Sequence, residues 1–422
     1  MRVFKFGGAS VKDAASVKNV GHIITNFSDD KVVVVASAMG KTTNAMEVIV
    51  DSLYNKDYDA FRAQVQERKQ FHLAIVDDLF EQKNHPIFDE VKNIFNNLGN
   101  PTHLPIAENY DFEYDQIVSL GEVVSTKIIQ AYIGLNRKDT VWMDARQLVR
   151  TNNNYRYADV KWDKTESLIR DFVAKHSEKT VFVTQGFLGH TDESFTTTLG
   201  REGSDFTAGI FAYCLDAKDV TIWKDVPGML NADPKWFDNT VKLDMISFKE
   251  AIELSYYGAS VIHPKTLKPL QNKGIPLYVK SFVHPENMGT VIQRSTEHDA
   301  LIPSFIFKMN QVLMSITPKD FSFIAEENLS DIFKRLASES ARINVMQNSA
   351  LSFTACMDIR PESLPKIVEN LSADYIIKYN NDLELVTIRH YDQATIDRVT
   401  TGKQIFMEQK TRQTVRIVMK NS

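Results

Sequence analysis

Residues 31–45, KVVVVASAMGKTTNA, join an apolar β-branched run to a turn of small and hydroxyl-bearing residues. The run Val32–Val35 predicts a buried strand, and the residues after the turn predict a helix that begins near Asn44. Gly40-Lys41-Thr42 matches the end of a P-loop. That loop, however, needs a glycine at the position of Val35, where the backbone takes a positive φ. The sequence therefore argues against a P-loop, yet a strand, a turn and a helix start still predict an anion site.

Similar short apolar runs alternate with helical patterns, such as 114–133 and 248–257, over the first 300 residues. This alternation predicts an α/β fold with a mostly parallel sheet and helices on both faces. The predicted strands are RVFKF (2–6), KVVVVAS (31–37), DTVWMDA (139–145), KTVFVTQ (179–185), DVTIWKD (219–225) and IPLYVKS (275–281). Residues 56–98 are charged, helical in pattern and poor in strand signals, so they predict a helical insertion.

The pattern changes near residue 300. From Gln311 the predicted order is βαββαβ, with strands at 311–317, 342–347, 351–358 and 374–379 and helices near 329–336 and 362–371. A second pass follows, with strands at 384–390, 403–409 and 413–419 and a helix at 392–399. It lacks a closing helix and strand, so we expect a second copy of the chain to cover its sheet.

Bulk composition excludes several classes of function. The 422 residues suit two or three domains, and 49 basic against 54 acidic residues, without a basic cluster, argue against a nucleic-acid surface. Cys214 and Cys356 are the only cysteines, so neither a disulfide framework nor a zinc site is indicated. The first residues enter a strand at once, and no apolar run approaches a membrane span. We expect a cytoplasmic protein.

The first candidate site is KFGGAS, residues 5–10, where a strand leads through two glycines into a helix expected near Ser10. Gly7 and Gly8 let the backbone approach a ligand closely, and Lys5 adds a positive charge beside the helix start. These features fit a phosphate cradle. Tight packing between strand and helix would explain the glycines equally well.

The second candidate is TTTLGREGSDFTA, residues 196–208, which precedes a helix. Arg201 lies between two glycines and could hold a carboxylate or phosphate through a two-pronged hydrogen bond. Ser204 and Asp205 follow at the expected helix start, where either could simply cap the helix. The loop predicts an anion-binding site or a solvated turn.

Two further stretches carry charges with weaker signals. Glu122 in SLGE lies inside an amphipathic helix, where it could hold an ammonium group or face solvent. The stretch WKDVPGMLNADPK, residues 223–235, places Lys224, Asp225 and Lys235 around a turn, where the lysines suit a nucleotide's phosphates or an ordinary surface.

Taken in order, six motifs resemble those of the aspartokinases, in the amino acid kinase family: KFGGAS (5–10), SAMGKTTN (37–44), SLGE (119–122), TTTLGREGSD (196–205), WKDVPG (223–228) and YGASVIHP (257–264). The resemblance implies a three-layer αβα catalytic domain over residues 1–300 and a tandem ACT regulatory region over 301–422, its second unit truncated. It also implies transfer of a phosphoryl group from ATP, with Mg²⁺, to the side-chain carboxylate of L-aspartate. That reaction is the first step toward lysine, threonine and methionine.

The resemblance and the chemistry of phosphoryl transfer together assign catalytic roles. Lys5 is expected to stabilise the transferring phosphoryl group, with the backbone of Gly7 and Gly8 beside it. Asp205 is expected to orient Lys5. No general base is needed, because the acceptor carboxylate is already ionised. No residue is assigned to a metal ion.

The substrate is expected to lie between two oppositely charged groups. Arg201 would hold the α-carboxylate of aspartate and Glu122 its ammonium, with Thr43 and Ser204 as further substrate contacts. Ser37, at the start of the loop that continues into Gly40-Lys41-Thr42, would meet the amino acid or the transferring phosphate. The GKT tripeptide is then a coincidence.

The nucleotide side departs from the family pattern. Lys224 occupies a position where threonine is usual, while Leu230 and Ser260 occupy positions where tyrosine and lysine are usual. Ala9 likewise replaces a threonine. We expect Lys224, Asp225, Leu230, Lys235 and Ser260 to lie near ATP, with Lys224 supplying the charge that Ser260 lacks.

Two alternatives remain at this level. Another amino acid kinase, acting on glutamate, a carbamoyl compound or a nucleotide, would share the glycine cradle; a non-catalytic amino-acid sensor would use only the ACT half. The chain length argues against fusion to a homoserine dehydrogenase. We expect a homodimer whose ACT region binds an end-product amino acid, lysine rather than threonine, near residues 317–328.

Overall fold

The computed structural model describes residues 1–27, 30–99, 109–259, 262–320 and 322–421. Two compact units divide these residues. The first comprises Met1–Met229, Lys242–Ile252 and Val261–Thr296, and the second comprises Leu230–Val241, Glu253–Ser260 and Glu297–Ser422. Helix α9 (Phe248–Tyr257) contributes residues to both units.

An eight-stranded sheet forms the centre of the first unit, in the order β3-β4-β2-β1-β7-β9-β10-β8. All neighbouring strands are parallel except β9 and β10, which pair antiparallel. The strands are β1 (Arg2–Phe6), β2 (Val32–Ala36), β3 (Thr140–Met143), β4 (Val181–Gln185), β7 (Val220–Lys224), β8 (Met245–Ser247), β9 (Leu277–Ser281) and β10 (Thr290–Gln293). The prediction of a mostly parallel sheet is confirmed, and each predicted run before residue 300 contains one of these strands.

Helices cover both faces of this sheet, because the side chains of its strands alternate in direction. Phe4 and Phe6 of β1 join a core that also contains residues of α1, α2 and α5. Lys5, between them, points to the opposite face, toward α8. The sheet therefore delivers one charged side chain from the middle of an apolar strand.

The sequence predicts the starts of only some helices of the first unit: the helix expected near Asn44 begins at Thr42, and the helix expected over 114–133 begins at Tyr110. A short 3₁₀ helix covers Gly8–Val11, and the α-helix expected near Ser10 begins only at Ala14. The α-helices are α1 (Ala14–Phe27), α2 (Thr42–Tyr54), α3 (Tyr58–Leu79), α4 (Ile87–Leu98), α5 (Tyr110–Asn136), α6 (Ala145–Leu148), α7 (Trp162–Lys175), α8 (Gly203–Cys214) and α10 (Pro264–Lys273). A small hairpin, β5 (Leu188–His190) with β6 (Thr196–Thr198), precedes α8. Within the part of the chain that the structure describes, no helix has an apolar stretch long enough to cross a bilayer.

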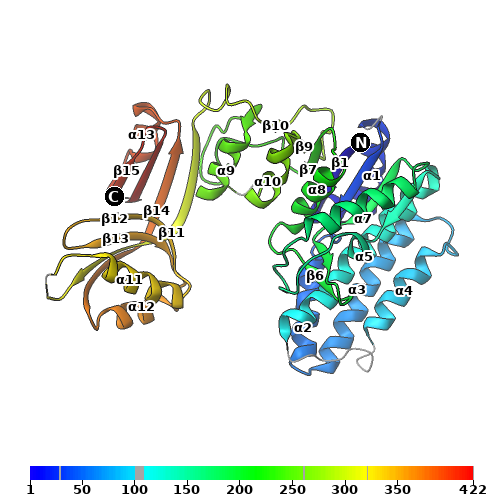
Figure 1. Cartoon of the computed structure of the whole chain (residues 1–422), viewed down its shortest axis with the longest axis horizontal. Helices are drawn as coiled ribbons and strands as arrows, with labels where there is room; N and C mark the ends of the chain where they lie inside the picture. Colours follow the sequence, from blue (N-terminus) through cyan, green and yellow to red (C-terminus); the bar gives the residue numbers. More distant parts are fainter. Residues whose placement is uncertain (28–29, 100–108, 260–261, 321, 422) are drawn as a thin grey trace. The chain divides into compact units, whose positions relative to one another are not determined.

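Residues 56–98 form the helices α3 and α4, which pack on each other and on α5 (Figure 1). Phe61, Val65, Val91 and Phe95 are buried and belong to the same core as the sheet residues Phe4 and Phe6. The two helices therefore extend the main core.

The second unit contains a six-stranded antiparallel sheet in the order β12-β13-β11-β14-β16-β15. Its strands are β11 (Ser304–Pro318), β12 (Arg342–Asn348), β13 (Phe353–Asp358), β14 (Tyr375–Arg389), β15 (Lys403–Lys410) and β16 (Thr414–Asn421). Helices α11 (Glu326–Ser338) and α12 (Leu364–Leu371) lie together over one half, as Figure 1 shows, and α13 (Gln393–Thr400) packs on the other.

Two long strands link these halves, and here the sequence prediction was wrong. The predicted strands 374–379 and 384–390 are one strand, β14, and β11 begins at Ser304 rather than at Gln311. The first half of β11, Ser304–Lys308, pairs with the end of β14. It thus supplies the strand that the second pass lacks, so the need for another chain to complete this sheet disappears.

The segment Leu230–Val241 covers part of the same half-sheet. Phe237 stacks on Phe305 of β11 with ring centroids 4.3 Å apart, and the guanidinium of Arg398 on α13 lies 4.0 Å from the Phe237 ring centroid. Asn231 donates to the Pro303 carbonyl and accepts from the Phe305 N–H through its own carbonyl. A stretch that the sequence assigned to nucleotide binding is therefore anchored within the second unit.

Candidate active site

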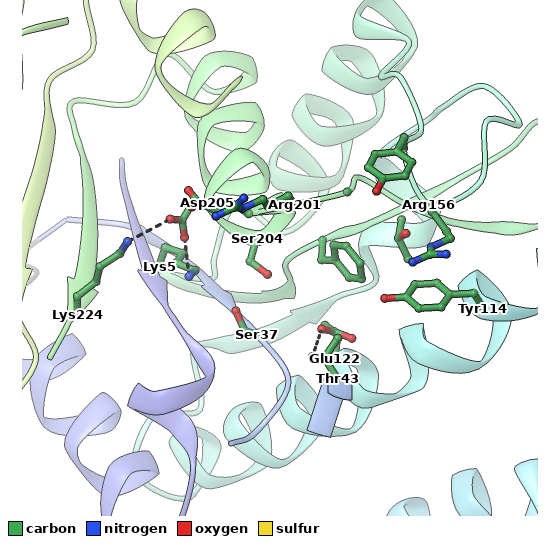
Figure 2. Close-up of a pocket in the computed structure, with 16 residues that line it drawn as sticks. Lys5, Ser37, Thr43, Tyr114, Glu122, Arg156, Arg201, Ser204, Asp205 and Lys224 are labelled. Atoms are coloured by element: carbon green, nitrogen blue, oxygen red, sulfur yellow. Dashed lines mark hydrogen bonds and ion pairs between the residues drawn. The ribbon is translucent and has the colours of Figure 1, made fainter. Parts of the chain in front are cut away.

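A pocket of about 500 Å³ lies in the first unit, near the carboxyl ends of β1, β2 and β7 (Figure 2). In open parallel sheets this edge is the usual place for a ligand. Eight residues selected from the sequence line it: Lys5, Ser37, Thr43, Glu122, Arg201, Ser204, Asp205 and Lys224. Side chains from five separate motifs thus meet in one cavity.

One end of the pocket carries two lysines around one carboxylate. Lys5 Nζ lies 2.5 Å from Asp205 Oδ1, and Lys224 Nζ lies 3.7 Å from Asp205 Oδ2. The Lys5 and Asp205 side chains are only 9% and 5% exposed. Because Asp205 lies in the first turn of α8, its carboxylate fixes both cations beside a helix N-terminus. The local charge is positive despite the chain's net charge of −5.

The glycine turns bring two loops into direct backbone contact. A Cβ on Gly8 would lie 2.7 Å from the Gly40 carbonyl oxygen and 2.9 Å from that of Ala38. The Gly40 N–H donates to the Gly8 carbonyl, and Gly40 has φ +57. Gly40, the glycine of the GKT tripeptide, thus supports the loop that contains Gly7 and Gly8. Gly7 lies beside Lys5 Nζ, since a Cβ there would be 3.4 Å from it.

Glu122 lies on α5 and is only 2% exposed. The Thr43 hydroxyl donates to its Oε1 over 3.4 Å, and its Oε2 is buried without a well-formed hydrogen bond within the described residues. Burial raises the pKa of Glu122 to about 8, and the backbone N–H of Ala38 opposes this only in part. A buried carboxylate with a spare acceptor favours a cationic ligand at this end.

The glycine that precedes Glu122 explains how this carboxylate reaches the pocket. A Cβ on Gly121 would lie 3.0 Å from Thr42 Cγ2 and 3.4 Å from Ala38 Cβ. The missing side chain therefore lets α5 approach the start of α2. The SLGE motif carries a packing role beside its charge.

Several pocket residues were not selected from the sequence. Tyr114 lies on α5 two turns before Glu122, a spacing that could have revealed it. Arg156 and Tyr157 come from a loop that follows no strand, and Phe187 has an unusual φ of +72. Nothing in the sequence pattern marks these three.

The expected nucleotide residues are not all brought together. Asp225 is exposed and does not line the pocket, although Lys224 does. Leu230 and Lys235 belong to the second unit. Ser260 lies outside the described residues.

Lysines, glycine turns and a helix N-terminus at the carboxyl edge of a parallel sheet are typical of an enzyme that transfers phosphoryl groups by positioning and charge. The amino acid kinase family model matches residues 1–281 of 422. This chain belongs to the amino acid kinase family.

Individual relatives cover nearly the whole chain. The lysine-sensitive aspartokinase 3 of Escherichia coli is 28% identical over 415 residues, which cover 96% of this chain and 90% of that protein. The chloroplastic aspartokinase 2 of Arabidopsis thaliana is 29% identical over 402 residues, which cover 89% of this chain and 71% of that protein.

Solved structures show the same fold. Aspartokinase III of E. coli in complex with aspartate and ADP matches with a TM-score of 0.79 at 26% identity, covering 99% of this chain and 96% of that one. The same enzyme in complex with lysine and aspartate gives a TM-score of 0.80, and the match covers 99% of this chain and 95% of that one.

Proposed function

We propose that this chain is an aspartate kinase, which transfers the γ-phosphoryl group of ATP to the side-chain carboxylate of L-aspartate. The observation that carries the proposal is one pocket with a buried, under-bonded carboxylate, Glu122, at one end and Lys5 with Lys224 at the other. An amino acid with a second carboxylate matches this order of charges. The aspartokinases that resemble the chain over most of its length support the same substrate.

In this proposal the side-chain carboxylate oxygen of aspartate attacks the γ-phosphorus, the bond to the β-phosphate oxygen breaks, and ADP leaves. Lys5 neutralises charge on the transferring group, and Asp205 holds Lys5 in place. Arg201 takes the α-carboxylate and Glu122 the ammonium, with Thr43, Ser37 and Ser204 around them. No proton has to move at the attacking oxygen.

Mg²⁺ would neutralise the phosphates of bound ATP. The described residues contain no cluster of three or more His, Cys, Asp or Glu side chains that could enclose an ion. Mg²⁺ keeps several waters and binds mainly through substrate phosphates, so the proposal assigns no residue of this chain to it. Lys224, at the end of β7, would meet the nucleotide, and Asp225 follows it directly in the chain.

The deciding experiment compares acceptors in an ATP-dependent assay that measures ADP. Aspartate should be phosphorylated, whereas glutamate, carbamate and uridine monophosphate should give little ADP. ADP formation that does not depend on aspartate would contradict the proposal. The alternative of a pure amino-acid sensor predicts no turnover with any acceptor.

We also propose that the second unit is a feedback region for an end-product amino acid, with lysine favoured over threonine. The support is the name of the lysine-sensitive relative and the lysine complex of its structure. The expected effector segment, residues 317–328, is described except for residue 321. Adding each amino acid to the assay tests the choice, and absence of inhibition by either would refute it.

We include a homodimer in the same proposal, but the structure replaces the argument made for it from the sequence. The second pass is completed within the chain by Ser304–Lys308, so the support is now the sheet edge at β12, Arg342–Asn348. An edge strand carries unpaired backbone groups that a second copy could pair with. Light scattering after size exclusion measures the oligomeric state, and a monomer at assay concentration would contradict this.

A further inference from the structure

Three of the eleven non-glycine residues with positive φ in the described chain line the active-site pocket: Arg156, Phe187 and Glu202. A positive φ is unfavourable for any residue that carries a side chain. Residues held in this conformation by their surroundings gather at functional sites. Of these three only Arg156, with φ +65, carries a positive charge. A large cation therefore occupies a backbone position better suited to glycine.

The backbone of Arg156 is held by a buried carboxylate. Its N–H donates to Asp115 Oδ2 over 2.9 Å, and the same carboxylate accepts from the Thr198 N–H at 2.9 Å and the Thr198 hydroxyl at 2.7 Å. Thr198 ends β6, three residues before Arg201. One carboxylate thus ties the loop of Arg156 to the loop of Arg201. This tie uses the main chain of Arg156 and does not depend on its side chain.

The guanidinium of Arg156 is also fixed. It lies 4.4 Å from the Tyr114 ring centroid, and Nη1 donates to Asp111 Oδ1 over 3.2 Å. Glu47 Oε1 is a looser partner at 3.9 Å. These contacts use only part of its five N–H donors, and the side chain is 31% exposed toward solvent and pocket. Arg201, by contrast, is exposed.

Figure 2 shows Arg156 and Tyr114 on the same side of the pocket as Glu122, while Lys5 and Lys224 lie on the other. The ammonium and the α-carboxylate of an amino acid are bonded to one carbon, so the groups that hold them must be neighbours. Glu122 needs a nearby cation to complete this pair.

We propose that Arg156 is a specificity-determining residue that binds the α-carboxylate of the amino-acid substrate, together with Arg201. The inference rests on the proposed function and adds to it the guanidinium that the sequence motifs do not contain. A guanidinium already positioned by Tyr114 and Asp111 loses little freedom on binding, so it favours affinity for the amino acid. ATP binding should not depend on it.

The test uses Arg156→Gly in the full chain, because glycine accepts the positive φ and keeps the backbone bond to Asp115. The KM for aspartate should rise roughly 10- to 100-fold, as expected for loss of a charge-assisted hydrogen bond. The KM for ATP and the melting temperature should stay close to wild type. Lys56→Gly is the matched control, since it removes an exposed cation at φ +61 outside the pocket and should change neither KM.

Arg156→Lys provides a second variant that keeps the charge but loses the two-pronged geometry. Its KM for aspartate should lie between that of the wild type and that of Arg156→Gly. A wild-type KM for aspartate in both Arg156 variants would overturn the inference while leaving the aspartate kinase intact. A wild-type protein that does not phosphorylate aspartate would overturn the proposed function itself. A lowered melting temperature without a change in KM would assign Arg156 a structural role only.

Discussion

The pH dependence of aspartate binding should report on Glu122. With a pKa raised to about 8 by burial, this side chain is mostly protonated at neutral pH, and it must ionise before it can pair with an ammonium group. Each pH unit below the pKa makes the free energy of aspartate binding less favourable by about 1.36 kcal/mol. Relative to pH 8, the KM for aspartate should therefore rise about fivefold at pH 7 and about fiftyfold at pH 6.

The assay is an initial-rate measurement at saturating ATP with direct quantification of ADP, because coupling enzymes carry their own pH dependence. The limiting rate should change much less than KM, since bound substrate keeps Glu122 ionised. Titration calorimetry in buffers of different ionisation enthalpy should detect release of about one proton per aspartate at pH 7. Glu122→Gln, which cannot ionise, should have a high KM that is flat with pH.

The same pKa shift predicts the stability of the ligand-free protein. The folded state binds a proton that the unfolded state releases between the ordinary pKa of 4.5 and about 8, so the contribution of Glu122 to stability falls as pH rises through this window. Aspartate should offset that loss, and its effect on the melting temperature should grow with pH. A KM for aspartate that stays within twofold from pH 6 to 8 would refute this account of Glu122.

Lys5→Ala should lower kcat by about 100- to 1,000-fold in a folded protein, because a buried cation beside the reacting phosphate is lost. Lys224→Ala should lower kcat less, since Lys224 lies farther from Asp205. Equal losses of kcat in the two variants would argue against the separate roles proposed for the two lysines. Gly8→Ala should lower both the melting temperature and kcat, since its Cβ would meet two carbonyl oxygens, whereas Gly7→Ala should be milder. His72→Leu should raise the melting temperature: burial lowers the pKa of His72 to about 4, and its Nε2 is buried without a partner in the described chain. A fall in melting temperature would show that its bond to the Arg68 carbonyl matters more.

Local pattern was enough to predict the parallel sheet, whereas selecting half of the pocket residues also needed the resemblance of the ordered motifs to a known family. A run such as Val32–Ala36 is fully buried on both faces and can hardly form anything but a central strand. Parallel strands share one carboxyl edge, and because β1 and β7 are neighbours in the sheet, Lys5 and Lys224 lie near each other.

The rest depends on contacts that no local pattern contains. Arg156 reaches the pocket because Asp115, 41 residues earlier, holds its backbone. In the second unit, Asn380 to Asp382 resemble a turn, yet they form an irregularity inside one strand, with Asp382 at φ +55. Asn and Asp tolerate this conformation in turns and bulges alike, so their presence cannot distinguish the two.

The excursion of Leu230–Val241 into the second unit has a consequence for engineering. A chain cut after residue 296 would keep this segment but lose the surface around Phe305 and Arg398 that buries Phe237. Such a fragment would expose an aromatic side chain and would be expected to aggregate. Chimaeras that exchange regulatory halves between relatives should therefore carry residues 230–241 with the incoming half, and a crossover placed only at the end of the first unit should give insoluble protein.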